Sequence, residues 1–211
     1  MTNSITCAAV IAARNEALHI RRVLINYIEQ GIDVVVIDHG STDETVHICK
    51  EFIGGGLLHI EHLAWEGKFS LSAQLRAKES IYKNLTYDWI IHADADEWLQ
   101  SSVSEESLIQ GIERLSNMGY NVINFEEFVF LLINLKDDIP KNYEQKFLDY
   151  YFFAPAENRL MRAWRRADQL YNKDSGGHKL VGNNVNIAPE SFILRHYIVI
   201  IVSFCVPSQH R

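Results

Sequence analysis

The chain has 211 residues, of which 47% are hydrophobic and 22% charged, and its formal net charge is −7. This is the composition of a globular protein of about one domain, and its acidic balance gives no support for nucleic-acid binding. Three widely spaced cysteines without a Cys-x-x-Cys motif indicate free thiols in a reducing compartment, the cytoplasm. The apolar run at residues 198–204 is too short to cross a bilayer, so we expect no transmembrane segment and at most peripheral membrane contact.

The first hundred residues alternate between strand and helix patterns. Apolar runs predict buried strands at residues 5–13, 33–38, 57–63 and 89–91. Helical spacing predicts helices at residues 17–30, from about 42 to 51, and at about 70–83. Such alternation requires parallel pairing with right-handed crossovers. We therefore predict an α/β fold with a Rossmann-like, mostly parallel central sheet flanked by helices in a single domain. No Gly-x-Gly-x-x-Gly or P-loop motif is present, which argues against the usual dinucleotide-binding and P-loop classes.

Three acidic residues follow the strand predicted at residues 89–91, namely Asp94, Asp96 and Glu97. Carboxylates at the carboxyl end of a strand lie where open α/β sheets bind their ligands. Only the small Ala95 separates the two aspartates, so we expect both carboxylates to converge on one centre. Their mutual repulsion would be relieved by a hard divalent cation that also binds substrate phosphates. A polar strand end that caps the next helix is the structural alternative.

The second half of the chain is less regular. Its patterns predict an amphipathic helix at 104–118, a strand at 120–132, a loop at 136–144, an aromatic segment at 150–155, a glycine turn at 174–178 and a strand at 193–197. We expect the aromatic side chains of 150–153 to lie in the core and the basic cluster at 162–166 to lie on a solvated face.

Three motifs at predicted strand ends carry a family resemblance: Ala-Ala-Arg-Asn-Glu at 12–16, Val-Ile-Asp-His-Gly-Ser-Thr-Asp-Glu-Thr at 36–45, and His-Ala-Asp-Ala-Asp-Glu at 92–97. Together they resemble family 2 glycosyltransferases, which have the GT-A fold. A Gly-Gly-His turn at 176–178 and an Arg-His-Tyr strand at 195–197 resemble a bacterial branch more weakly. The resemblance implies transfer of a sugar from a nucleotide-diphospho-sugar donor to a glycan, lipid-linked or other acceptor. It also implies inversion at the anomeric carbon and a Mn²⁺ or Mg²⁺ cofactor.

The resemblance implies roles for individual residues. Those expected to contact the nucleoside or its phosphates are Asn15, Glu16, Asp38, Arg76 and Lys68. Arg76 is the better match, and Lys68 the next, for a basic residue that the family often places before the metal motif. Those expected to hold the metal or diphosphate are Asp94, Asp96 and His196. Direct displacement also needs a base for the acceptor's proton, and the candidates are Glu97, Glu126, Glu127, Asp174 and His178. We favour Glu97 or His178 as the catalytic base, because each lies inside a motif. Asp38 could instead cap the next helix, and Arg76 could be a solvated charge.

We divide the chain into a nucleotide-binding half at 1–100, an acceptor-side half at 101–197 and an atypical tail at 198–211. The tail is apolar where the family continues with polar and basic helical sequence. The alternative function is therefore that of a truncated or degenerate relative, which binds nucleotide without efficient transfer. A phosphatase with an aspartate nucleophile is less favoured, because its Asp-x-Asp motif usually follows the first strand rather than the fourth.

Overall fold

The computed structural model of the chain describes residues 4–134, 142–146, 148–152 and 158–201. The loop predicted at 136–144 and the aromatic segment predicted at 150–155 lie partly outside the described residues, and the tail beyond residue 201 lies wholly outside them. Within the described part, Cys7 and Cys49 are free and buried.

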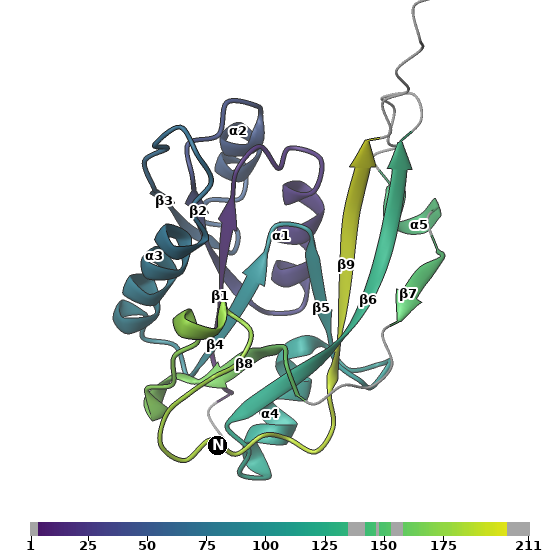
Figure 1. Cartoon of the computed structure of the whole chain (residues 1–211). Coiled ribbons are helices and arrows are strands. Elements are labelled where there is room, and N and C mark those ends of the chain that lie inside the picture. The colour runs from purple at the N-terminus through teal and green to yellow at the C-terminus, as the bar shows by residue number, and fades with distance from the viewer. Residues whose placement is uncertain (1–3, 135–141, 147, 153–157, 202–211) are drawn as a thin grey trace, which may run out of the picture.

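Four parallel strands form the first half of the sheet, in the order β3–β2–β1–β4 (Figure 1). They are β1 (Cys7–Ala13), β2 (Asp33–Asp38), β3 (Leu57–His62) and β4 (Trp89–Asp94). The helices that connect them are α1 (Ile20–Glu29), α2 (Thr45–Lys50) and α3 (Leu71–Asn84). The predicted alternation is therefore confirmed. Helices α1 and α2 begin about three residues later than predicted, because the chain turns after β1 and β2 before it becomes helical.

The second half extends the same sheet. Its elements are β5 (Glu97–Gln100), α4 (Leu108–Asn117), β6 (Val122–Asn134), α5 (Tyr143–Lys146), β7 (Tyr150–Phe152), β8 (Met161–Arg165) and β9 (Phe192–Ile201), with short 3₁₀ helices η1 (Arg166–Asp168) and η2 (Lys173–Ser175). The strand order continues as β4–β8–β6–β9–β5, with β7 on the outer edge of β6. Strand β8 is antiparallel to both β4 and β6, whereas the long β6 and β9 run parallel to each other (Figure 1).

Two boundaries in this half differ from the sequence-based expectation. Helix α4 begins at Leu108 rather than near residue 104, because Ser107 and Gln110 form a capping box at its start. The strand predicted at 193–197 continues through Ile201, and residues 198–201 pair with 131–134 of β6. The first residues of the predicted atypical tail therefore belong to the sheet.

Both faces of the central strands are buried, so successive side chains of each strand enter different cores. On one face Ile11 and Trp89 pack with apolar side chains of α1, α2 and α4. On the other face Val10 and Ile90 pack with α3 and with residues 170–187. The same alternation turns His92, two residues after Ile90, toward α3, where its ring meets Tyr82. The last residue of β4 therefore reaches the sheet edge on the α3 side.

Candidate active site

The carboxyl ends of β1, β2 and β4 meet at one edge of the sheet, where the strand order reverses around β1. Open α/β sheets bind ligands at such switch points. The residues found there are Asn15 and Glu16 after β1, Asp38 at the end of β2, and Asp94 and Asp96 at the end of β4. Burial and then the negative charges of neighbours, foremost Asp96, raise the pKa of Glu16 to about 8. The edge is thus a concentration of acidic groups.

Asp94 lies between two cations. Its Oδ1 is 3.0 Å from Nζ of Lys78, and its Oδ2 is 3.5 Å from Nη2 of Arg162. Desolvation raises the pKa of this carboxyl, but Lys78 and Arg162 more than offset it and hold the pKa well below its usual range. Asp94 is therefore ionised, and its negative charge is balanced by Lys78 of α3 and Arg162 of β8.

Lys78 is the basic residue that α3 brings to the strand ends. It is buried, and its ammonium donates to the backbone oxygen of Ala93 at 2.6 Å as well as to Asp94. The basic residues predicted to contact the nucleotide, Arg76 and Lys68, are both exposed. Neither makes a hydrogen bond or ion pair within the described residues. A contact of Arg76 or Lys68 with nucleotide stays a prediction.

Glu97 is buried under the site rather than open to it. Its Oε1 accepts a hydrogen bond from Nη2 of Arg162, and its Oε2 accepts one from the backbone nitrogen of Asp94 at 3.1 Å. Burial raises the pKa of Glu97 to about 7. A catalytic base must reach the proton it takes, but both oxygens of this 2% exposed residue are occupied inside the protein. The geometry therefore argues against a direct role of Glu97 as a base in this arrangement, and its expected catalytic role stays a prediction. Arg162 is likewise buried, not on the solvated face expected for its cluster.

Asp96 points to the last strand of the sheet. Its Oδ2 is 3.2 Å from Nε2 of His196, and Nδ1 of the same ring is 2.8 Å from Oε1 of Glu127. Although burial lowers the pKa of His196, hydrogen bonds to the two carboxylates raise it to about 10. At neutral pH the ring is therefore a cation that donates from both nitrogens, to Asp96 and to Glu127.

This assignment predicts a pH dependence of stability in the presence of EDTA. A histidine whose folded-state pKa is raised contributes stability that is complete below about pH 6.5 and is lost as the pH rises through about 10. We expect the free energy of unfolding to fall over that window by about 1.5–3 kcal/mol more than in His196→Gln, the scale of a hydrogen bond to a charged group. Urea titrations at several pH values measure it. Parallel pH profiles for both proteins would contradict the assignment.

Two linked loops form the part of the edge that follows β1 and β2. Asp38 is 6% exposed, and its Oδ1 accepts a hydrogen bond from the backbone nitrogen of Ser41 at 2.9 Å. The N-cap residue of α2 is Glu44, so Asp38 does not cap that helix. Asn15 has a φ of 55°, and its side-chain oxygen accepts from the backbone nitrogen of Thr42 at 2.8 Å. Asn15 therefore fixes the loop after β1 to the loop after β2.

The glycine turn predicted from the sequence packs directly on β4. Gly177 has a φ of +87°, and a Cβ added there would lie 2.7 Å from Cε1 of His92. His178, the next residue, is exposed. Burial and then the positive charge of Arg162 lower the pKa of His178, so its ring is neutral at neutral pH. The backbone oxygen of Gly177 accepts a hydrogen bond from Nη1 of Arg162 at 3.3 Å, so the turn that carries His178 adjoins the arginine that pairs with Asp94.

The close packing at Gly177 gives a testable prediction with an internal control. Gly119 also has a positive φ, +91°, but a Cβ there would meet nothing within 4 Å. We expect Gly119→Ala to cost about 1 kcal/mol of unfolding free energy for the strained backbone alone. Gly177→Ala should cost about 1–3 kcal/mol more, because the His92 ring must also shift. Equal losses in urea denaturation would show that the turn tolerates a methyl group.

Carboxylates such as those at the edge are suitable ligands for a hard cation. The protein side chains alone, however, do not provide a complete set of ligands. Within the described residues no group of three or more His, Cys, Asp or Glu side chains is arranged to hold a metal ion. Asp94 is paired with its two cations, and one oxygen of Asp96 contacts His196. Mg²⁺ and similar ions are commonly bound by one or two carboxylates plus substrate phosphates. The donor set therefore fits an ion that takes its other ligands from a bound diphosphate.

Comparison with known proteins identifies the family of this chain. The model described as Glycosyl transferase family 2 matches residues 8–149, and the chain belongs to this family. An uncharacterized glycosyltransferase of Rickettsia bellii is 34% identical over 99 residues, which is 47% of this chain and 30% of that protein. Glycosyltransferase GlyA of Streptococcus pneumoniae is 27% identical over 124 residues, 56% of this chain and 17% of that protein. The chain thus spans less than a third of the length of these curated relatives.

Solved structures show the same fold. The crystal structure of S. aureus TarS 1–349 has a TM-score of 0.54 with 13% identity, covering 92% of this chain and 60% of that one. The complex of TarS 1–349 with UDP-GlcNAc has a TM-score of 0.53, covering 98% of this chain and 62% of that one. At this identity the likeness concerns the fold, which is the predicted GT-A fold. Among the described residues, no helix is long and apolar enough to cross a membrane.

Proposed function

We propose that this chain binds a nucleotide-diphospho-sugar and takes part in the transfer of its sugar to an acceptor, with inversion at the anomeric carbon. The observation that carries the proposal is the set of strand-end acids Asp38, Asp94 and Asp96 at one edge, with Lys78 and Arg162 paired to Asp94 and His196 paired to Asp96. Membership of glycosyltransferase family 2 supports it. TarS 1–349 binds UDP and UDP-GlcNAc, so UDP is the first nucleotide to test here.

We infer that different residues of the edge bind different parts of the donor. Asp38, with Asn15 and Glu16 beside it, would contact the nucleoside. Asp94 and Asp96 would hold Mn²⁺ or Mg²⁺, which stabilises negative charge on the diphosphate leaving group. Lys78 and Arg162 keep Asp94 ionised and in place before any ligand arrives. Such preorganised charges cost no rearrangement when the donor binds.

We infer that His178 is the better of the two favoured candidates for the acceptor's base. The residue is exposed and follows Gly177, whose backbone oxygen accepts a hydrogen bond from Arg162. Partial desolvation and then the charge of Arg162 lower the pKa of its ring, which favours the neutral form at neutral pH. A neutral imidazole can accept the proton that an attacking hydroxyl loses. Among the other candidates, Glu127 is engaged by His196 and Arg159, and Glu97 is enclosed.

A thermal-shift panel of nucleoside diphosphates, with and without Mn²⁺, tests the proposal. A ligand at about 100 times its Kd stabilises the native state by about 2.7 kcal/mol, which raises the midpoint of a chain of this size by about 5–10 °C. Asp38→Ala should reduce nucleotide affinity by about 1–3 kcal/mol, as expected when a buried hydrogen bond is lost. An Asp38→Ala protein with wild-type affinity would remove Asp38 from the site. No shift with any nucleotide would refute the proposed function.

A second assay separates an enzyme from a nucleotide-binding relative. Donor binding is measured by calorimetry, and sugar transfer or donor hydrolysis is measured on the same preparation. Binding together with product formation supports the enzyme. Binding without either product supports the alternative, in which the chain holds a nucleotide but does not complete the reaction.

A further inference from the structure

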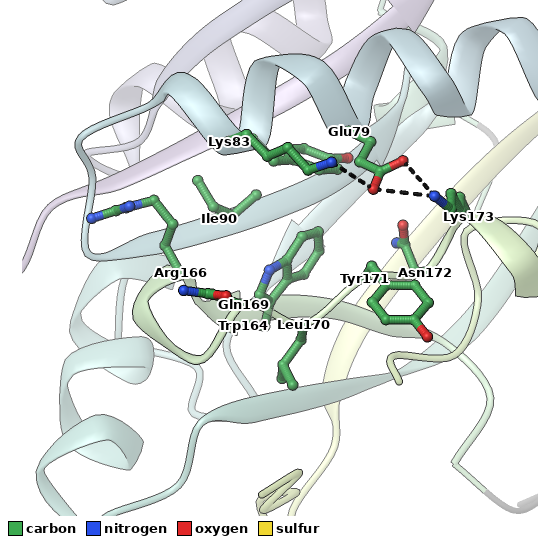
Figure 2. A pocket seen from close by; sticks show the side chains of 11 residues that line it. Glu79, Lys83, Ile90, Trp164, Arg166, Gln169, Leu170, Tyr171, Asn172 and Lys173 are labelled. Carbon is green, nitrogen blue, oxygen red and sulfur yellow. Dashed lines mark hydrogen bonds and ion pairs between the residues drawn. The ribbon is translucent and has the colours of Figure 1, made fainter. Parts of the chain in front are cut away.

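A cavity of about 490 Å³ lies between α3 and the segment that follows β8 (Figure 2). It is on the α3 face of the sheet, and it contains none of the residues assigned above to donor, metal or base. Its apolar wall is formed by Ile90, Trp164 and Leu170, with the ring of Tyr82 beside them. This volume is within the range of small-molecule sites, which are mostly apolar with a few placed polar groups.

Trp164 brings an unused hydrogen-bond donor to this wall. The residue is only 2% exposed, and its ring stands edge-on to Tyr82 at 5.0 Å between centroids. Within the described part of the chain, the indole nitrogen has no hydrogen-bond acceptor. This nitrogen is not among the enclosed polar atoms that lack a partner, so it is open to solvent. An occupant of the cavity with an acceptor atom would take the place of that solvent.

The polar side of the cavity is predominantly positive. Glu79 bridges Lys83 and Lys173, with a distance of 3.1 Å to each ammonium (Figure 2). Arg166 is the third cation at the rim, and its Nε donates to the backbone oxygen of Tyr87 at 2.9 Å. The lining of the cavity therefore carries three cations and one carboxylate, in a chain whose overall charge is −7. A negatively charged group is favoured at this rim.

Two polar residues of the wall are already fixed in position. The hydroxyl of Tyr82 and the amide nitrogen of Asn172 lie 3.1 Å and 3.3 Å from Nδ1 of His92. Both residues are buried. A ligand would therefore meet a preformed wall and would not have to order these side chains, which lowers the cost of binding.

We propose that this cavity is a ligand site for a small amphipathic anion. The flat apolar part of the ligand would lie against Trp164 and Leu170. Its carboxylate, sulfonate or phosphate group would lie at the rim formed by Lys83, Arg166 and Lys173. The site is separate from the strand-end acids, and the proposal does not depend on the glycosyltransferase activity.

A fluorescence titration with 8-anilinonaphthalene-1-sulfonate tests the proposal on the full chain. We expect saturable binding at one site and weaker binding of the uncharged N-phenyl-1-naphthylamine. Lys173→Gln and Lys83→Gln should each weaken sulfonate binding by about 2- to 5-fold, the scale of an exposed charge contact. Glu79→Gln should strengthen it by a similar factor, since it releases both lysines. Lys50→Gln, on α2 at the other face, is the matched control and should have no effect.

Filling the cavity gives an independent measurement. Leu170→Trp should abolish binding while circular dichroism shows a folded protein. If that variant does not fold, Trp164→Phe keeps an aromatic ring but removes the N–H donor, and should weaken binding. The proposal is overturned by non-saturable binding, by equal binding of the uncharged probe, or by changes of the same sign in Glu79→Gln and Lys173→Gln. Undiminished binding to folded Leu170→Trp or to Trp164→Phe would also overturn it.

Discussion

Replacing Arg162 with methionine is expected to lower the free energy of unfolding by about 3–5 kcal/mol. The guanidinium of Arg162 is buried, pairs with the enclosed carboxylate of Glu97 and lies 3.5 Å from Asp94. Methionine has a similar length but no charge, so Glu97 would remain buried without its counter-ion. Removing one partner of a buried pair is costly because the other charge stays uncompensated. Urea denaturation of the two proteins measures the difference.

Two further variants separate this effect from a general loss of packing. Arg162→Met combined with Glu97→Gln removes the stranded charge, and should recover about 1–3 kcal/mol relative to the single change. Arg165→Met alters a nearby, partly exposed arginine, which pairs with Asp168 at 2.8 Å, and should cost about 1 kcal/mol or less. If Arg162→Met and Arg165→Met cost the same, the buried network would have no special role in stability.

Asp96→Ala is expected to produce the largest functional loss. If Asp96 holds the cation that stabilises the leaving diphosphate, its removal costs several kcal/mol in the transition state. That corresponds to a fall of about 10³-fold in sugar transfer. The variant should also lose Mn²⁺-dependent binding of nucleoside diphosphate in calorimetry. The backbone contact at this position, from the nitrogen of Tyr197 to the oxygen of Asp96 at 3.0 Å, does not involve the replaced side chain.

Glu105→Ala is the control for this experiment. Glu105 is an exposed acid on the loop before α4, so its loss changes the net charge by the same amount without touching the strand ends. We expect its nucleotide binding and transfer rate to match the wild type. Metal-dependent binding that survives in Asp96→Ala would remove this residue from the metal site.

The strand-end motifs were predictable because they depend on local patterns. An apolar run that ends in an acid indicates a buried parallel strand and a ligand-binding edge, and the structure has β1, β2 and β4 meeting in this way. Lys78 was also detectable in principle. It lies three residues after Leu75 and four before Tyr82, so helical spacing places it on the buried face of α3, whereas Arg76 is exposed.

Other parts of the site depend on long-range pairing that no local pattern shows. Arg162 looks like one member of a basic surface cluster, but β8 is inserted next to β4 and is buried on both faces. Its partner Glu97 is 65 residues away in sequence. The burial of Glu97 depends on this long-range pairing. The local motif does not show that burial, and for this reason the motif alone suggested a catalytic base. The enclosed residue orders the turn after β4.

The pairing of β5 with β9 sets an order for assembly of the site during synthesis. Glu97 on β5 is opposite His196 on β9. His196 also contacts the side chain of Asp96, which lies one hundred residues earlier in the chain. The β1–β4 sheet can begin to form as soon as its own residues have left the ribosome, but the turn that carries Asp96 gains these contacts only when β9 arrives. Contacts of such high sequence separation form late, because a long loop must first be closed. We therefore expect the edge formed by β1, β2 and β4 to take shape early in folding, and the contacts that fix Asp96 to be among the last to form.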